Sequence, residues 1–241
     1  METKRISLWS GPRNVSTALM YSFAQRADTE AYDEPLYAHY ITHETDRPPH
    51  PGESEIVGAQ ENDGRKVIEE LFQASSKSPI RLFKNMAHHL VGLEWDFLGS
   101  LSNVLLTRQP EEMLMSYKNT IPEFKISDTG YPKLKRLCDT IVEMGQEPIV
   151  IDSKILLQSP KRTLVKLCHK LGIPFYESML SWPKGPKKED GVWAPHWYHN
   201  VHLSTGFAPY RPKMERFPNE LQKLLETCQP LYEALSPWVL K

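Results

Sequence analysis

Residues 10–17 join an apolar segment to a helix-like segment and carry several groups that could bind a phosphate. Residues 5–10 are typical of a short strand, and residues 16–25 have apolar side chains at helical spacing. A helix start presents unpaired backbone N–H groups and a positive dipole end, and both favour a phosphate. The loop adds one fixed positive charge and polar side chains able to bind the same anion, namely Arg13, Asn14, Ser16 and Thr17.

The end of this loop separates it from the phosphate loops that cleave ATP or GTP. That motif ends in Gly-Lys-Ser or Gly-Lys-Thr, whereas Val15-Ser16-Thr17 stands in its place here. The residues alone leave open the alternative of a plain capped helix beside a surface arginine.

An arginine and a serine form a second candidate anion site. Arg108 directly follows the apolar strand-like run 101–107, and Ser116 lies eight residues later, about two turns into the following helix. Both side chains could converge on one phosphate. A salt-bridged surface arginine is the alternative that this pair leaves open.

Two further segments carry chemistry-bearing side chains. His88 and His89 follow the strand-like residues 79–84, where an imidazole could act as a general base because its pKa lies near neutrality. A metal site has less support, since no third ligand stands at a recognisable spacing. Near the C-terminus, Lys184 and Gly185 open a loop able to fold over an anion, although such lysine-rich loops are more often solvated surface.

Alternating strand and helix patterns predict a single α/β domain over residues 1–241, in which a central, mainly parallel sheet lies between two helical layers. The segments with strand character are residues 5–10, 29–32, 79–84, 101–107 and 148–152. Ligands bind such sheets beyond the carboxyl ends of the strands, so the loops at 10–17, 33–35 and 84–89 and the loop after Thr107 are expected to meet. We expect a mobile loop at 43–64 and an ordered loop region at 182–212.

Composition narrows the class of protein. The 241 residues carry a formal net charge of −1, which disfavours a whole-protein electrostatic grip on nucleic acid or an acidic membrane. Three widely spaced cysteines give little support to a disulfide framework or a zinc site. No signal-peptide pattern or long apolar run is present, so we expect a cytoplasmic protein without a membrane anchor. The sequence leaves the oligomeric state open.

Taken together, these motifs resemble the P-loop sulfotransferases that use 3′-phosphoadenosine 5′-phosphosulfate (PAPS). The 5′-phosphosulfate loop of that family reads Lys/Arg-Ser-Gly-Thr/Ser-Thr, and residues 13–17 are similar to it. The family's 3′-phosphate site is an arginine that closes a strand and a serine eight residues later, a spacing matched by Arg108 and Ser116. The run from Asp33 to Tyr40 resembles a less-studied branch, which includes stand-alone proteins and domains fused to aminotransferase-like sequences.

The resemblance implies transfer of a sulfuryl group from PAPS to a hydroxyl or amine of an unidentified small-molecule acceptor, with adenosine 3′,5′-bisphosphate as the product and no metal. It implies that residues 13–17, including Val15, hold the 5′-phosphate, and that Arg108 and Ser116, helped by Lys184 and Gly185, hold the 3′-phosphate. Arg13 would stabilise the charge that develops on the leaving group. Arg13 and Arg108 would then reach opposite ends of one nucleotide.

The base that takes the acceptor's proton remains a choice among residues. His88 or His89 is the first candidate, and Glu34 or Asp33, at another strand end, is the second. Two positions depart from the family pattern. Arginine stands at 13 where lysine is usual, and Val15 replaces the loop glycine, which leads us to expect a loop of altered shape because a β-branched residue resists positive φ.

The same residues allow two alternative hypotheses about function. One is a nucleotide-binding or regulatory protein that kept the fold and lost the reaction, which the departures at positions 13 and 15 motivate. The other is a different P-loop enzyme, such as a kinase, against which the absent Gly-Lys-Ser/Thr argues.

Overall fold

The computed structural model describes residues 3–212 and 214–241 and contains one five-stranded sheet. The strands are β1 (Lys4–Ser10), β2 (Thr29–Asp33), β3 (Ile80–Met86), β4 (Ser102–Thr107) and β5 (Ile149–Asp152). They are ordered β2-β3-β1-β4-β5, and every neighbouring pair is parallel. The predicted parallel α/β fold is therefore confirmed.

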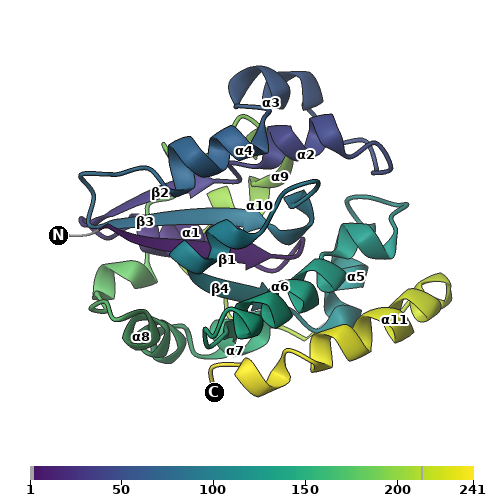
Figure 1. Cartoon of the computed structure of the whole chain (residues 1–241). Coiled ribbons are helices and arrows are strands. Elements are labelled where there is room, and N and C mark those ends of the chain that lie inside the picture. Colours follow the sequence, from purple (N-terminus) through teal and green to yellow (C-terminus); the bar gives the residue numbers. More distant parts are fainter. Residues whose placement is uncertain (1–2, 213) are drawn as a thin grey trace.

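The strands alternate their apolar side chains between two cores, which makes the sheet the middle of three layers. Leu8 of β1 and Leu106 of β4 pack on one face with α1 (Ser16–Ala24) and α8 (Pro160–Leu171). Their neighbours in the chain, Trp9 and Leu105, point to the opposite face and pack there with α6 (Tyr131–Glu143). Figure 1 shows the helices on either side of the sheet, with α2, α3 and α4 gathered at the top, beside β2 and β3.

Shorter elements complete the chain. The remaining helices are α2 (Tyr37–His43), α3 (Glu53–Ala59), α4 (Gly64–Val67), α5 (Pro110–Lys118), α7 (Ser153–Gln158), α9 (Ala194–Trp197), α10 (His199–His202) and α11 (Gln222–Glu233). A single π-helical turn, η1 (Ile68–Phe72), follows α4. The 3₁₀ turns are η2 (Ala87–His89), η3 (Asp96–Ser100), η4 (Ile126–Thr129), η5 (Glu177–Leu180), η6 (Asn219–Leu221) and η7 (Ser236–Trp238).

Residues 43–64 differ from the expected mobile loop, because helix α3 forms within them. Gly52 lies at φ 75 and lets the chain turn into this helix. Ile56 is fully buried there and packs in one apolar cluster with Tyr37 and Trp193. Ile56 and Val57 are the only bulky aliphatic residues of this polar segment, and two adjacent residues show no periodicity. Their partners from distant parts of the chain could therefore not be predicted from the local pattern.

Residues 182–212 contain the short helices α9 and α10 rather than loop alone. Trp193 and Tyr198 are buried in this region, 2% and 5% exposed. The C-terminal tail reaches the outer edge of the sheet, where Val239 forms a parallel bridge with Val150 and the Leu240 N–H donates to the Val150 carbonyl at 2.9 Å. Among the described residues, no helix combines the length and apolar character needed to cross a membrane.

Candidate active site

A cavity of about 360 Å³ opens at the carboxyl edge of the sheet. Its lining includes Arg13 from the loop after β1, Glu34 after β2, His88 after β3 and Arg108 after β4. Residues 197–208 contribute further parts of the cavity wall, among them Tyr198. Four loops far apart in sequence thus meet at one place, as a parallel sheet predicts.

The loop after β1 holds two non-glycine residues in the left-handed region. Arg13 has φ 60 and Val15 has φ 62. Side chains fix this shape, because the Asn14 amide donates to the Leu106 carbonyl at 3.1 Å and the Ser153 hydroxyl donates to the Asn14 carbonyl at 2.9 Å. Val15 therefore does not prevent the conformation that a glycine would adopt, and the loop stores backbone strain at the start of α1.

Two arginines meet beside this loop. The Arg108 guanidinium donates to the backbone carbonyl of Arg13 at 2.9 Å and pairs with Glu112 at 3.0 Å. The Arg13 Nε donates to the Ser116 hydroxyl at 3.2 Å. Burial lowers the pKa of Arg13, and the nearby positive charge of Arg108 lowers this pKa further. With Glu112 as the only carboxylate bonded to either arginine in the described chain, the pair has surplus positive charge suited to an anion.

This arrangement differs in one respect from the expectation that the two cations lie at opposite ends of a nucleotide. Arg13 contacts Ser116, the residue that sequence spacing had paired with Arg108. A long guanidinium side chain can reach across the loop that carries it, and sequence spacing does not specify its direction.

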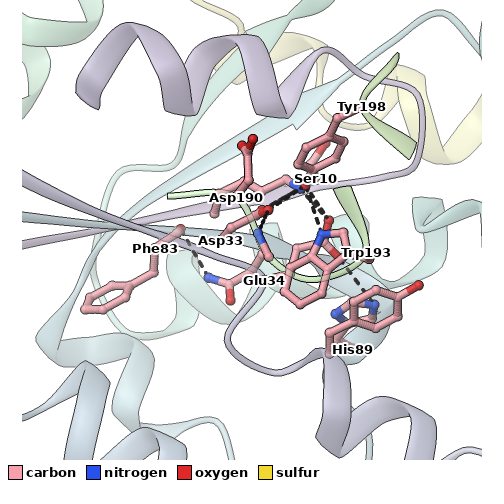
Figure 2. A network of polar contacts seen from close by, with 12 residues as sticks. Ser10, Asp33, Glu34, Phe83, His89, Asp190, Trp193 and Tyr198 are labelled. Carbon is pink, nitrogen blue, oxygen red and sulfur yellow. Dashed lines mark hydrogen bonds and ion pairs between the residues drawn. The ribbon is translucent and has the colours of Figure 1, made fainter. Parts of the chain in front are cut away.

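Glu34, Lys84 and Tyr198 also line the cavity, and they belong to a buried ion cluster whose polar contacts are shown in Figure 2. Lys84 is 1% exposed, and its ammonium donates to Asp33 Oδ1 at 2.9 Å, to Glu34 Oε1 and to the Tyr198 hydroxyl at 2.7 Å. Burial alone would lower the pKa of Lys84, but the two carboxylates outweigh it and raise this pKa above its ordinary value. Lys84 is therefore a cation at pH 7.

Sequence reasoning assigned no role in the chemistry to Lys84 or Tyr198. A usable signal existed for Lys84, because a lysine near the end of an apolar strand needs an opposite charge on a neighbouring strand. Asp33 is its register partner on β2. The aromatic Tyr198 carried no comparable signal, since its partners lie more than 100 residues away.

Glu34 combines burial with an unusual backbone. Its φ is 40, and its backbone N–H donates to the Lys84 carbonyl at 2.7 Å. Burial raises the pKa of Glu34, the negative charge of Asp33 adds to this, and Lys84 opposes it. Oε1 is bound to Lys84, whereas Oε2 lies 3.9 Å from Nε2 of His89, beyond hydrogen-bond distance.

The two histidines of the sequence prediction both line the cavity but are buried, His88 to 7% and His89 to 1% exposure. Burial lowers the pKa of His88 to about 3 and lowers the pKa of His89 well below 6.5. His89 stacks between Tyr37 and Tyr40, with 4.7 Å between ring centroids in each pair. Both imidazoles are therefore neutral and weakly basic at pH 7.

Lys184 and Gly185 stand apart from the other predicted site residues. Neither lines the cavity, and Lys184 is exposed. The Gly185 N–H donates to the His202 carbonyl at 2.8 Å. Further along the same loop, Asp190 accepts one hydrogen bond from the Tyr21 hydroxyl, and its Oδ2 lies 2.8 Å from Nε2 of His202. These contacts hold the loop against α1 and α10 instead of over the two arginines.

Solved structures with the same fold come from sulfotransferases. A sulfotransferase from Alicyclobacillus acidocaldarius gives a TM-score of 0.56 at 12% identity, covering 98% of this chain and 96% of that one. The sulfotransferase domain of the Synechococcus PCC 7002 olefin synthase gives 0.55 at 14% identity, covering 94% of each chain. The sulfotransferase domain from the curacin biosynthetic pathway gives 0.51 at 16% identity, with 98% and 97% covered. At these identities, the likeness shows the fold.

Two curated relatives from Arabidopsis thaliana are similar in sequence. Branched-chain-amino-acid aminotransferase-like protein 2 is 39% identical over 95% of this chain, and protein 1 of that name is 39% identical over 97%. The chain spans 41% and 42% of their lengths. The family model described as a sulfotransferase domain matches residues 4–238, nearly the whole chain, and the chain therefore belongs to the sulfotransferase domain family.

Proposed function

We propose that this chain transfers the sulfuryl group of PAPS to a hydroxyl or amine of a small, uncharged acceptor. The observation that carries the proposal is the convergence of Arg13, Arg108 and Ser116 at the start of α1, in the same cavity as a buried carboxylate, Glu34. Membership of the sulfotransferase domain family supports the reaction class.

The donor end of the cavity supplies two kinds of anion-binding group. The backbone N–H groups of Val15, Ser16 and Thr17 at the start of α1 would hold the 5′-phosphate. Arg108 and Ser116 would hold the 3′-phosphate, and the surplus positive charge of the arginine pair fits that role. PAPS supplies a sulfuryl group on a phosphate that leaves as adenosine 3′,5′-bisphosphate. Arg13 would stabilise the negative charge that grows on this leaving phosphate.

Glu34 is the base that the geometry favours. The acceptor oxygen or nitrogen forms a bond to sulfur, the bond from sulfur to the bridging phosphate oxygen breaks, and the acceptor proton passes to Glu34 Oε2. A carboxylate with a raised pKa is a stronger base than an ordinary glutamate. His88 and His89, whose pKa values are lowered by burial, are the weaker candidates.

Neutral aromatic side chains surround the acceptor end. Tyr37, His50 and Trp197 line the cavity there. Burial lowers the pKa of His50 to about 4, so this imidazole is uncharged at pH 7. Lys84 is occupied by two carboxylates. Among the described residues that line the cavity, Arg13 and Arg108 are assigned to the donor and Lys84 is already paired, so no positive charge remains for the acceptor. An anionic acceptor would lose its hydration without compensation, which is why we propose an uncharged one.

A ligand comparison tests the proposal. Thermal unfolding is measured with PAPS, adenosine 3′,5′-bisphosphate, ATP with magnesium, and NAD, and sulfuryl transfer from PAPS is measured with a panel of acceptors. We expect stabilisation by the first two ligands, about 2.7 kcal/mol at 100 times Kd, together with transfer. Tight binding without transfer to any acceptor would favour the regulatory alternative, and magnesium-dependent ATP turnover would favour a kinase.

A further inference from the structure

Asp33 is a buried carboxylate that does not line the cavity. It is 7% exposed, and it is absent from the residues that form the cavity wall. Its Oδ1 accepts from Lys84 at 2.9 Å, and its Oδ2 accepts from the Tyr198 hydroxyl at 2.7 Å and from the Gly191 N–H at 3.3 Å. A carboxylate so placed acts on the reaction only through its partners.

Every polar hydrogen of these partners is used. Lys84 has three N–H donors, and Asp33, Glu34 and Tyr198 take one each. The Tyr198 hydroxyl gives its one proton to Asp33 and accepts from Lys84 and from Trp193 Nε1, the latter at 3.1 Å. Because the hydroxyl can neither rotate nor accept a further donor, it fixes the orientation of both charged neighbours.

One carboxylate oxygen of the cluster has no hydrogen-bond donor among the described residues. Glu34 Oε1 is bound to Lys84, and among the described residues no hydrogen bond reaches Glu34 Oε2. Glu34 lines the cavity, whereas Asp33 does not. Lys84 thus forms ion pairs with two carboxylates, of which Glu34 lines the cavity and Asp33 does not.

We propose that Asp33, oriented by Tyr198, is a positioning residue that draws part of the charge of Lys84 away from Glu34 and so sets the basicity of Glu34 Oε2. This inference rests on the proposed function, in which Glu34 takes the acceptor's proton. Asp33 itself touches neither substrate, and the proton moves from the acceptor to Glu34 alone.

The groups that face Glu34 determine the direction of each effect. They are Asp33 at the end of β2, Lys84 of β3, His89 of η2, Tyr37 of α2, and Tyr198 after α9. His89 is neutral, and burial raises the pKa of Tyr37 and of Tyr198, so both phenols are uncharged. Lys84 and Asp33 are therefore the charges that can move the Glu34 titration.

Two substitutions in the network should move this titration in opposite directions. Asp33→Asn keeps the shape but removes the competing charge, so Lys84 serves Glu34 alone and the Glu34 pKa falls. Tyr198→Phe keeps the Asp33 charge but removes its hydroxyl donor, so Lys84 turns toward Asp33 and the Glu34 pKa rises. One nearby charge moves a carboxyl pKa by one to three units, so we expect shifts of about one pH unit.

The experiment is the pH dependence of kcat between pH 5 and 9 at saturating PAPS and acceptor. We expect the acid limb to lie at lower pH in D33N and at higher pH in Y198F than in the unmodified chain. Asp152→Asn is the matched control, because Asp152 is also a buried carboxylate at a strand end, and asparagine can still cap α7 there. Its acid limb should not move.

Two further outcomes separate the inference from the proposed function. If the unmodified chain transfers sulfuryl groups but both variants shift the limb the same way or not at all, the positioning role of Asp33 is wrong. If the unmodified chain shows no transfer, the proposed function itself fails. Adenosine 3′,5′-bisphosphate should bind both folded variants as it binds the unmodified chain, and if D33N does not fold, the sign of the Y198F shift still decides.

Discussion

The Nε of Arg13 lies 3.2 Å from the hydroxyl of Ser116, joining two residues separated by 103 positions in the chain. Arg108 completes the group by donating to the backbone carbonyl of Arg13. Both arginines are therefore positioned by each other as well as by the sheet. An anion bound between them would be in contact with the start of α1 and with α5.

Removal of the Arg13 side chain should affect the chemical step. We expect Arg13→Ala to lower kcat by a factor of about 10² to 10³, the effect typical of losing one donor to a developing negative charge. Arg13→Lys should lose less, because it keeps the charge. The exposed Arg162 on α8 supplies the control, since Arg162→Ala should leave kcat unchanged. Near-normal turnover of R13A would remove Arg13 from the mechanism.

Arg108 should distinguish between nucleotides. Arg108→Ala is expected to weaken binding of adenosine 3′,5′-bisphosphate at least tenfold, the equivalent of about 1.4 kcal/mol, and to weaken adenosine 5′-phosphate much less. Calorimetric titration of both ligands into the variant measures the two dissociation constants. An equal loss for both would assign Arg108 to the 5′ side of the nucleotide instead.

Val15 offers a test of stored backbone strain. In the middle of a helix or strand alanine is more stable than glycine by about 0.5–1 kcal/mol, but at φ 62 that order should reverse. We expect V15G to be more stable to denaturant than V15A by about 1 kcal/mol. The control pair is V165G and V165A in helix α8, where Val165 is 42% exposed and alanine should be the more stable. The usual order at position 15 would mean that no strain is held there.

Burial of His88 makes the fold sensitive to acid. Its pKa is lowered from 6.5 to about 3, so between these values the unfolded chain binds a proton that the folded chain does not. Stability contributed by the neutral imidazole is thus complete above pH 6.5 and falls as the pH drops, by up to about 1.4 kcal/mol per pH unit.

Denaturant unfolding between pH 7 and 4 measures this effect. The free energy of unfolding of His88→Gln should decline less steeply with falling pH than that of the unmodified chain. Substitution of the exposed His199 by glutamine should not change the slope. Parallel slopes for all three proteins would show that folding does not lower the pKa of His88.

The charge of the acceptor should determine how efficiently it is sulfated. Among 4-ethylphenol, tyramine and 4-hydroxyphenylacetate, which differ mainly in charge, we expect the neutral phenol to be sulfated with the highest kcat/KM and the carboxylate with the lowest, at least tenfold down. Initial rates with PAPS at saturation give the comparison. Preference for the carboxylate would mean that a cation of the cavity is free to pair with the acceptor.

Much of the fold was predictable because several strands have a clear local sequence pattern. Residues 101–107 and 148–152 are short apolar runs with turn signals beside them, and strands β4 and β5 lie there. Parallel order then brings the ends of all strands to one edge, which is why Arg13, Glu34, His88 and Arg108 could be expected at one place.

The interior of the site was less predictable, because it depends on partners far apart in the chain. Lys84 is stabilised by Asp33 and Tyr198, which are 51 and 114 residues away. The basicity of His88 and His89 depends on their burial, which lowers the pKa of both. The sequence around them does not indicate this burial. Lys184 matched a family motif, yet its loop folds against α1 and α10.

The parallel bridge between Val239 and Val150 places the C-terminal residues of the chain along the outer side of β5, the edge strand of the sheet. An open edge strand invites pairing with another molecule, and a tail that occupies it blocks that route to aggregation. Removal of residues 239–240 would therefore expose the outer side of β5.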